Sequence, residues 1–230
     1  MDSAAIRDRL LAEILDAGPD GRLSFDEYST VRRLGVPRAA LRDALSSLTE
    51  AGVLTRAPRL GTSLATALHH WSVEDTAVEP VAAGTRYDTV GIDLTTPHDE
   101  LSLELTGAAG SQVTRIERVS VLDGVAAEYW TIWTTLRLPE EYHRDGLPSD
   151  LNWYKIVGAI TGASTIQMTR RTIDCRATAA DRDRMDVEVG DPLRFTSRAL
   201  TLADGTPIDR GWGRSNSRMI IPTERFTIRL

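Results

Sequence analysis

Cysteine, lysine and long apolar runs are scarce in this sequence. Its single cysteine, Cys175, excludes an internal disulfide and a metal site built from several cysteines, so we expect the thiol to be a small buried hydrophobic group. Only Lys155 among the 27 basic residues is a lysine, which we attribute to codon bias. No stretch approaches the roughly 18 continuous apolar residues of a transmembrane helix.

The N-terminal residues also lack the features of a targeting segment. Asp2 and Asp16 stand where a signal peptide has a basic start and an apolar run, so we expect a cytoplasmic protein that does not contact a membrane. The composition, with 41% hydrophobic and 26% charged residues, is that of an ordinary soluble globular protein. A length of 230 residues allows one or two domains.

Charge is distributed unevenly along the chain. Residues 1–66 contain nine arginines and nine acidic residues, whereas residues 67–230 contain eighteen basic and twenty-four acidic ones, which accounts for the net charge of −6. An acidic protein can still bind nucleic acid when its basic groups gather on one face. The N-terminal third is the part of the chain where such a face can form.

The N-terminal part predicts two helices before residue 35. Apolar residues recur at helical spacing between Ser3 and Asp16, and this helix ends near Gly18. The motif SFDE at Ser24–Glu27 has the form of a capping box. It predicts a second helix that begins there and runs to about Arg33.

A third helix and a hairpin follow a break at Gly35. Pro37 suits the first turn of the third helix, because the N–H that proline lacks is not needed there, and the helix ends at Gly52. The next segment, VLTRAPRLGTSLAT, has β-prone residues on both sides of a turn that contains Pro58 and Gly61. It predicts a two-stranded hairpin that completes a domain over residues 1–66.

The rest of the chain predicts a linker and a second domain. Residues 67–80 are polar and aperiodic, which is typical of a linker. From residue 81 onward the strand-like segments are QVTRIERVSVLDG, EYWTIWTTL, IQMTRRTIDCRAT, PLRFTSRALTLADGTPI and ERFTIRL, with helical pieces around Asn152–Gly162 and Ala179–Met185. Because strands dominate, residues 81–230 predict an α+β domain with an antiparallel sheet.

The second and third helices have the spacing of a helix-turn-helix. In that motif the second helix enters the major groove of DNA and the first lies across the backbone. Arg38 and Arg42 lie one turn apart on the outer face of the third helix, whereas its apolar residues face the other way; these are Leu41, Leu45 and Leu48. The alternative is that both arginines are solvated surface charges. A hairpin directly after the helix favours DNA binding, because Arg56 and Arg59 would extend the positive charge toward adjacent phosphates.

This N-terminal pattern resembles the winged-helix signature of the GntR family of bacterial transcription factors. The residues that carry the resemblance are LGVPRAALRDALSSLTEAGVL and RLGTSL, within residues 6–65. The chain departs from the signature where FDEY replaces a Pro-Ser-Glu-Arg step, so that Tyr28 or Glu27 stands in place of an arginine, and where Leu60 replaces a basic wing residue. The resemblance implies that Arg38 and Arg42 contact DNA and that Gly61 and Thr62 form the wing tip. Together with Ala39 of the same helix and the hairpin arginines, the expected DNA-binding residues are Arg38, Ala39, Arg42, Arg56, Arg59, Gly61 and Thr62.

Residues 80–230 resemble the UTRA ligand-sensing domain of the HutC-like branch of that family. The segments IERVSVLDG, NWYKIVGAITG and LTLADGTPID correspond in order to the domain's motifs. The resemblance implies an antiparallel sheet with flanking helices, similar to the chorismate lyase fold, and a pocket for small anionic effectors. Ser120 stands at the place of the pocket's second arginine. The implied effector-binding residues are Arg118, Ser120, Glu128, Trp130, Asn152, Tyr154 and Asp209.

Several of these side chains have simpler interpretations. Arg118 lies on an alternating strand, where a solvated arginine is as reasonable as one that binds a ligand. Tyr154 and Trp153 could pack on a core, and we expect at least half of the tryptophans Trp130, Trp133, Trp153 and Trp212 to be packing residues. His143 is expected to be exposed. His69 and His70 have too few neighbouring ligands to predict a metal site.

The prediction that follows is a ligand-responsive DNA-binding regulator that binds a palindromic operator as a homodimer; the resemblance implies a repressor, the commonest role in that family. We expect no cofactor, no catalytic residue and no metal ligand, because no nucleophile–base pair or glycine-rich phosphate loop can be assembled. The alternative is an enzyme of chorismate-lyase-like fold acting on a small carboxylate. A third possibility, an all-helical sensor on the same DNA-binding unit, conflicts with the strand-rich second half.

The effector that this reading predicts is a small, partly apolar or aromatic carboxylate. A phosphate dianion usually needs two cations or a cation with several N–H donors, and only one arginine of the resembled pocket remains. One arginine can pair with a carboxylate through two hydrogen bonds. The alternative is a phosphosugar whose phosphate is held by backbone N–H groups.

Overall fold

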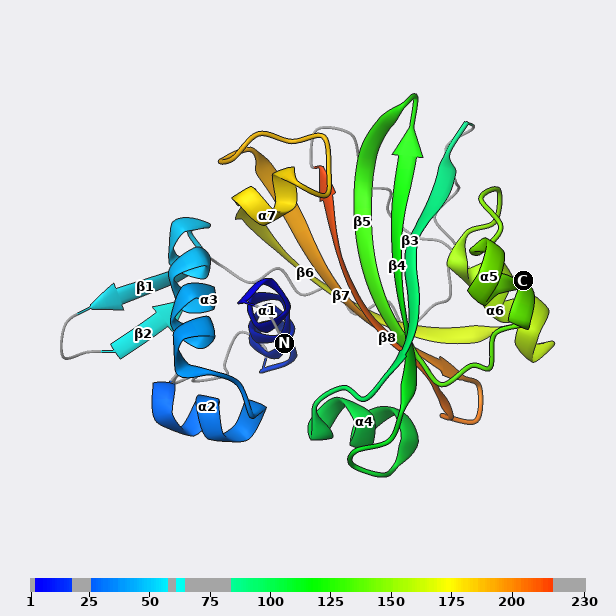
Figure 1. Ribbon diagram of the computed structural model, residues 1–230, viewed down its shortest axis with the longest axis horizontal. Helices are drawn as coiled ribbons and strands as arrows, with labels where there is room; N and C mark the ends of the chain where they lie inside the picture. Colours follow the sequence, from blue (N-terminus) through cyan, green and yellow to red (C-terminus); the bar gives the residue numbers. More distant parts are fainter. Residues whose placement is uncertain (1–2, 18–25, 58–60, 65–83, 217–230) are drawn as a thin grey trace.

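The computed structural model describes residues 3–17, 26–57, 61–64 and 84–216 (Figure 1). Its helices are α1 (Ser3–Ala17), α2 (Glu27–Leu34), α3 (Arg38–Glu50), α4 (Asp99–Thr106), α5 (Glu140–Asp145), α6 (Trp153–Thr161) and α7 (Ala179–Arg182). Its strands are β1 (Leu54–Ala57), β2 (Gly61–Leu64), β3 (Arg86–Thr95), β4 (Val113–Leu122), β5 (Val125–Thr134), β6 (Ile166–Arg176), β7 (Pro192–Leu202) and β8 (Pro207–Asn216). The predicted linker and the ERFTIRL segment lie outside the described residues.

The helix-turn-helix forms where the sequence predicts it, with one correction. Helix α2 begins at Glu27 and not at Ser24, because the side chain of Asp26 caps it by accepting a hydrogen bond from the Ser29 N–H at 2.7 Å. Gly35 ends α2 with a φ of 63°, a left-handed conformation that glycine adopts without strain. Pro37 is the N-cap of α3, whose buried residues are Leu41, Ala44, Leu45 and Leu48.

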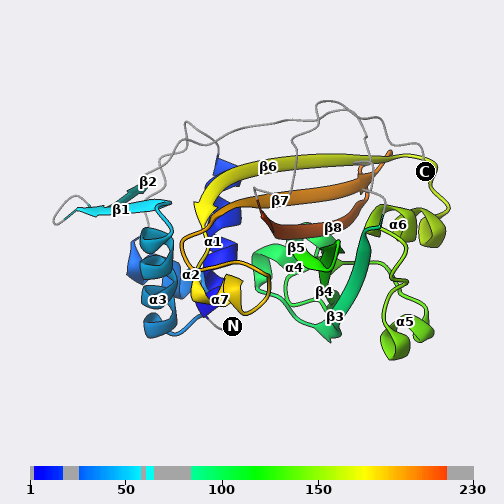
Figure 2. The same cartoon turned by 90° about the horizontal axis from the view of Figure 1, so that it is seen from above.

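Helix α1 lies between α3 and the large sheet (Figures 1 and 2). The amphipathic pattern of its sequence predicts one exposed face, but Arg7, Asp8 and Arg9 are as buried as the apolar residues beside them. A helix can be buried all round when its polar groups are paired. Its apolar residues belong to one continuous core with α3 and with Ile173 and Phe195 of the sheet.

The second part is a six-stranded antiparallel sheet in the order β3-β4-β5-β8-β7-β6. This confirms the predicted fold class, a winged helix followed by an antiparallel sheet with flanking helices. Helix α6 is confirmed with its caps Asn152 and Gly162, whereas α7 ends at Arg182, before the predicted Met185. The sequence patterns did not predict β3, α4 or α5, and the predicted strand segments reach only the first two residues of β8.

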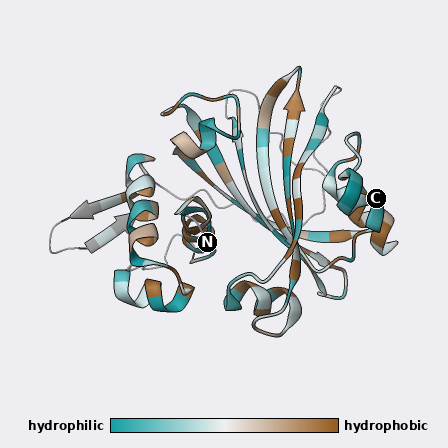
Figure 3. Ribbon diagram, in the orientation of Figure 1, coloured by the Kyte–Doolittle hydropathy of each residue, from teal (hydrophilic) through white to brown (hydrophobic). Residues whose placement is uncertain are grey.

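The two faces of this sheet pack against different elements. One face carries Trp212 and Phe195 against α1 and α4, and its apolar residues form a single cluster with them. The other face carries Ile116 and Ile132 against α6. The apolar bands on the strands and on the helices that flank them are visible in Figure 3. Because side chains alternate along a strand, neighbouring residues of β8 point to opposite faces.

The tryptophans confirm one packing expectation, and the single cysteine meets another in part. Cys175 packs against two apolar clusters but is half-buried, and loss of solvent around its thiol raises the pKa to about 11. Trp153 and Trp212 are core residues. His143 is exposed as predicted.

Within the described residues no helix is long and apolar enough to span a membrane, and no group of His, Cys, Asp or Glu could hold a metal ion.

Candidate DNA interface and ligand site

The first turn of α3 presents two arginines on the surface of the N-terminal part. The side chains of Arg38 and Arg42 are 66% and 56% exposed, and Ala39 is exposed beside them. Each arginine donates from its Nε to the same carboxylate oxygen of Glu27, at 3.2 and 3.0 Å. Hydrogen bonds from Arg42 and Arg38 lower the pKa of Glu27. The carboxylate therefore holds both arginines in place and offsets part of their charge.

The predicted wing is a two-stranded hairpin next to α3. Arg56 on β1 is the cross-strand partner of Thr62 on β2, and Ala57 is the partner of Gly61. Thr62 is half-buried. Arg59 lies outside the described residues. The hairpin therefore occupies the place that a winged helix requires, and the role of its side chains stays a prediction.

The predicted effector residues come together on the face of the sheet that α6 covers. Arg118 and Ser120 of β4 are cross-strand partners of Trp130 and Glu128 of β5. The remaining three come from the start of α6 and from β8; they are Asn152, Tyr154 and Asp209. The register of β4, β5 and β8 is what collects residues so distant in sequence.

Arg118 is buried and tied to backbone, which corrects the alternative of a solvated arginine. One terminal nitrogen donates to the Leu151 carbonyl at 3.1 Å, and the other donates to the carbonyls of Pro148 at 2.8 Å and Tyr87 at 3.2 Å. The guanidinium also lies 5.1 Å from the centre of the Tyr87 ring. Burial lowers the pKa of Arg118 to about 10, and no carboxylate among the described residues forms an ion pair with it. Its donors therefore fasten β4 to the loop before α6.

A carboxylate links the neighbouring strands β4 and β5 at this site. Glu128 accepts a hydrogen bond from the Ser120 hydroxyl at 3.4 Å and from the Trp130 indole N–H at 3.3 Å. The indole N–H of Trp130 is thereby held at Glu128, while the Arg198 guanidinium lies over the ring, 4.7 Å from its centre.

The side chains at the start of α6 have specific partners. The amide oxygen of Asn152 caps the helix by accepting from the Lys155 N–H at 3.0 Å. The indole N–H of Trp153 donates to Asp209, a second role for a side chain that the sequence predicts as core. Burial raises the pKa of Asp209, although the nearby Arg198 cation opposes this.

Arg198 of β7 is the main residue of this site that the sequence patterns missed. It is 3% exposed, donates to the Tyr154 hydroxyl at 3.2 Å, and has a terminal nitrogen 3.5 Å from Asp209. Alternation in the segment FTSRAL predicts that Arg198 and Phe195 face opposite sides of the sheet, but it does not say which side binds a ligand.

A cleft of about 540 Å³ lies beside this site, between β3 and α5. Tyr87, Asp88, His143 and Arg144 are among its lining residues, and none of the seven predicted effector residues is. It meets the site through Tyr87, whose carbonyl and ring contact Arg118, and through Thr89, the cross-strand partner of Arg118. The buried polar groups are the stronger candidate for a ligand site than this cleft, because buried charged groups with shifted pKa values gather at binding sites.

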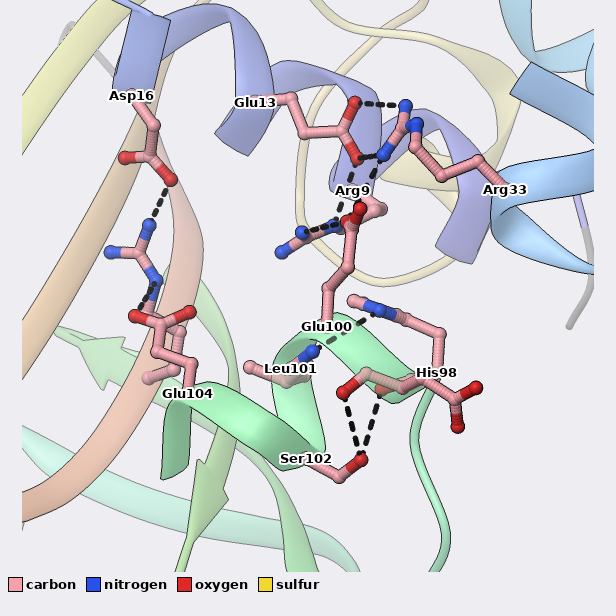
Figure 4. Close-up of polar contacts among 11 residues, drawn as sticks. Arg9, Glu13, Asp16, Arg33, His98, Glu100, Leu101, Ser102 and Glu104 are labelled. Atoms are coloured by element: carbon pink, nitrogen blue, oxygen red, sulfur yellow. Dashed lines mark hydrogen bonds and ion pairs between the residues drawn. The ribbon is translucent and has the colours of Figure 1, made fainter. Parts of the chain in front are cut away.

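Ion pairs connect the helix-turn-helix to the second part of the chain (Figure 4). Arg33 of α2 bridges Glu13 of α1 and Glu100 of α4, at 2.7 and 3.0 Å, and Arg9 contacts the same two carboxylates at 3.0 Å each. His98 caps α4 through its Nδ1, and burial lowers its pKa to about 4, which keeps that nitrogen free to accept.

Strand β8 has residues of the candidate ligand site on one face and contacts α1 with the other. Arg214 donates to both carboxylate oxygens of Asp8, and Arg210 pairs with Asp16. Asp209, directly before Arg210, lies on the opposite face and accepts from Trp153. The sequence RGWGR at residues 210–214 shows this alternation of large and small residues, which is the signal that could have predicted the arrangement.

The sequence matches no protein-family model and none of the curated proteins. Solved structures do resemble the chain. PhnF from Mycobacterium smegmatis has a TM-score of 0.55 at 15% identity, over 95% of this chain and 99% of that chain. The structure of the PhnF effector domain has a TM-score of 0.53 at 17% identity, over 60% of this chain and 85% of that chain.

Two other structures give the same result. A possible transcriptional regulator, YydK from Bacillus subtilis subsp. subtilis str. 168, has a TM-score of 0.50 at 12% identity, over 100% of this chain and 99% of that chain. A GntR-family transcriptional regulator from Bacillus cereus has a TM-score of 0.50 at 12% identity, over 63% of this chain and 100% of that chain. The chain has the fold of these proteins. At such identities a likeness establishes fold alone, so function rests on the residues described above.

Proposed function

We propose that the chain is a ligand-responsive transcriptional regulator that binds double-stranded DNA. The observation that carries this proposal is the exposed pair Arg38 and Arg42 at the start of α3, in the second helix of a helix-turn-helix followed by a hairpin. The fold shared with PhnF and the GntR-family protein supports it. The expected DNA-binding set is Arg38, Ala39, Arg42, Arg56, Arg59, Gly61 and Thr62.

In this proposal the protein acts in the cytoplasm as a homodimeric repressor. One winged helix reads a half-site, so a palindromic operator requires a two-fold dimer. Effector binding on the α6 face of the sheet favours a state whose two recognition helices no longer match the half-site spacing. The effector is a small carboxylate bound among Arg118, Ser120, Glu128, Trp130, Asn152, Tyr154 and Asp209.

The test starts from selection of fragments of the source organism's DNA by the full-length chain, followed by gel-shift titration. We expect a palindromic site. The double variant Arg38→Ala, Arg42→Ala should bind it at least about tenfold more weakly, since a good guanine contact contributes about 1–3 kcal/mol. Arg144→Ala, on exposed α5, is the matched control and should bind as the unaltered chain does. Unchanged binding by the double variant would contradict the proposal.

A further inference from the structure

Arg198 has unused hydrogen-bonding capacity in a buried position. Its Nε and Nη2 atoms are buried and have no hydrogen-bond partner, whereas Nη1 donates to the Tyr154 hydroxyl. Nε and Nη2 lie on the same edge of the guanidinium, and this pair of N–H groups binds a carboxylate through two parallel hydrogen bonds. Buried donors without partners are rare and call for an explanation.

Two aromatic rings and two glycines hold this guanidinium in place. The rings of Trp130 and Tyr154 lie 4.7 and 5.2 Å from it. At Gly211 a Cβ would come within 3.2 Å of the guanidinium, and at Gly213 a Cβ would come within 2.5 Å of the Trp130 ring. The absence of side chains on this part of β8 is therefore what lets Trp130 and Arg198 lie flat across the sheet.

Arg118, the arginine that the family resemblance places in the pocket, already uses most of its hydrogen-bond donors. Both of its terminal nitrogens donate to backbone carbonyls, and only its Nε lacks a partner. An incoming anion would have to compete with three carbonyl groups for it. Arg198 has two donors on one edge without a hydrogen-bond partner, although Nη2 also lies 3.5 Å from Asp209, so it is the better anion-binding group.

Asp209 supplies a complementary acceptor beside Arg198. Its Oδ2 accepts from the Trp153 indole and lies 3.5 Å from Nη2 of Arg198, whereas its Oδ1 is buried without a partner. A ligand that satisfies both residues must carry an anion for Arg198 and a hydrogen-bond donor for Asp209.

We propose that Arg198 is the residue that binds the effector's carboxylate, and that Asp209 accepts a hydrogen bond from a hydroxyl or amino group next to that carboxylate. The effector class is thus a 2-hydroxy or 2-amino acid with an apolar body. This inference rests on the proposed function and reassigns the anion-binding role within the same site. Because Arg198 and Asp209 are almost fully buried, the proposal requires the half-buried ring of Trp130 or Tyr154 to move aside when the ligand enters.

The chemistry favours a carboxylate over a phosphate. The two free N–H groups of Arg198 match two carboxylate oxygens in one plane, whereas a phosphate dianion usually requires a second cation. Arg118 does not supply that cation, because its terminal nitrogens are already engaged. Asp209 would also repel a dianion more than a monoanion.

The experiment compares three ligands with one carbon skeleton on the full-length protein. The probes are 3-phenyllactate, phenylalanine and 3-phenylpropanoate, with glucose 6-phosphate as the phosphate comparator, and binding is measured by calorimetric titration and thermal shift. We expect phenyllactate or phenylalanine to bind, and to bind about tenfold or more tightly than 3-phenylpropanoate, since only they can satisfy Asp209. Glucose 6-phosphate should not bind.

The deciding variant is Arg198→Lys, which keeps the positive charge beside Asp209 but removes the planar pair of donors. It should weaken binding about tenfold or more, whereas Arg194→Lys, on the exposed part of β7, should not. A double variant, Arg198→Met with Asp209→Asn, removes both charges together and should abolish binding while circular dichroism reports a folded chain.

Several results would overturn the inference. They are binding of glucose 6-phosphate alone, no binding of any carboxylate probe, or unchanged carboxylate affinity in Arg198→Lys. The last would mean that Arg198 and Asp209 form only an internal ion pair. DNA binding is measured separately by gel shift. If the unaltered chain binds no DNA, the proposed function is refuted. If it binds DNA but the ligand results fail, only the role of Arg198 is refuted.

Discussion

At the scale of single residues, Glu27 holds the two arginines that we propose contact DNA. Its carboxylate accepts hydrogen bonds from both Arg38 and Arg42. A phosphate or a base must replace that carboxylate before either arginine can contact DNA through the same nitrogen. Glu27 therefore competes with DNA, although it also keeps the two guanidinium groups ordered.

We expect Glu27→Gln to bind the operator a few-fold more tightly, because exposed ion pairs of this kind contribute only about 0.2–1 kcal/mol each. The measurement is fluorescence anisotropy against salt concentration. The control is Glu140→Gln on α5, which makes the same change of charge away from α3. Weaker binding by Glu27→Gln would show that ordering of the arginines outweighs competition.

Gly213 is a residue whose lack of a side chain has a clear steric role. A Cβ there would lie 2.5 Å from the Trp130 ring, and an indole ring cannot yield as a flexible side chain does. Gly213→Ala should therefore lower the free energy of unfolding by about 1–3 kcal/mol. Urea denaturation checks this. In a Trp130→Leu background the same substitution should cost much less, and an equal cost there would show that the ring is not responsible.

At the scale of elements, α1 and β8 are joined by buried ion pairs. Asp8 contacts Arg214 and Arg7, and Asp181 contacts the same two arginines at 2.8 and 3.0 Å. Four charges buried together are tolerated because each has opposite charges and hydrogen bonds nearby. Asp209 lies on the other face of β8. A ligand that shifts β8 would therefore also shift α1, the first helix of the DNA-binding unit.

Asp8→Asn should destabilise the protein by about 3 kcal/mol, since it leaves two buried arginines with one carboxylate between them. Chemical denaturation at neutral pH measures the change. Asp183→Asn, which breaks the exposed pair with Arg182, is the control and should alter stability by less than about 0.5 kcal/mol. Equal effects of the two variants would contradict the buried network.

The same pairs predict how stability depends on pH. Burial alone would raise the pKa of Asp8, but Arg214 and Arg7 lower it to about 2. A carboxyl group with a lowered pKa stabilises the folded state above its unfolded pKa, near 3.9, and this contribution is lost as the pH falls toward 2. It amounts to about 2 kcal/mol. Denaturation between pH 5 and 2 should show a shallower decline in Asp8→Asn than in the unaltered chain; parallel declines would refute it.

At the scale of the whole molecule, one apolar core runs from α3 through α1 into the sheet. The division into domains 1–66 and 81–230 stays a prediction, and the core implies that the two do not unfold independently. Far-UV circular dichroism, which reports helices of both parts, and tryptophan fluorescence, to which β5, α6 and β8 contribute, should give coincident urea transitions. Two separated transitions would show that α1 does not couple the parts.

The sequence by itself determined the local elements. The turn at Gly35 and Pro37, the periodicity of α3 and the hairpin depend on interactions between residues close in the chain, so spacing and cap residues were enough to predict them. The strands β4 to β7 were predictable from alternation and turn signals. The short helices α4 and α5 and the strand β3 were not predicted, because they have few periodic residues. Their formation depends on a capping side chain or on pairing with a neighbouring strand.

Only the tertiary structure decided what the site residues do. Alternation shows that Arg198 and Phe195 face opposite sides of β7 but not which side meets Trp130, since that depends on β8 lying between β5 and β7. The role of Arg118 also depends on distant residues, because its partners are carbonyls about thirty residues away. The charged face of α1 is buried because Arg214 and Arg210 lie opposite it. Pairing between distant segments carries no local signal, so burial and charge compensation emerge only when the sheet is assembled.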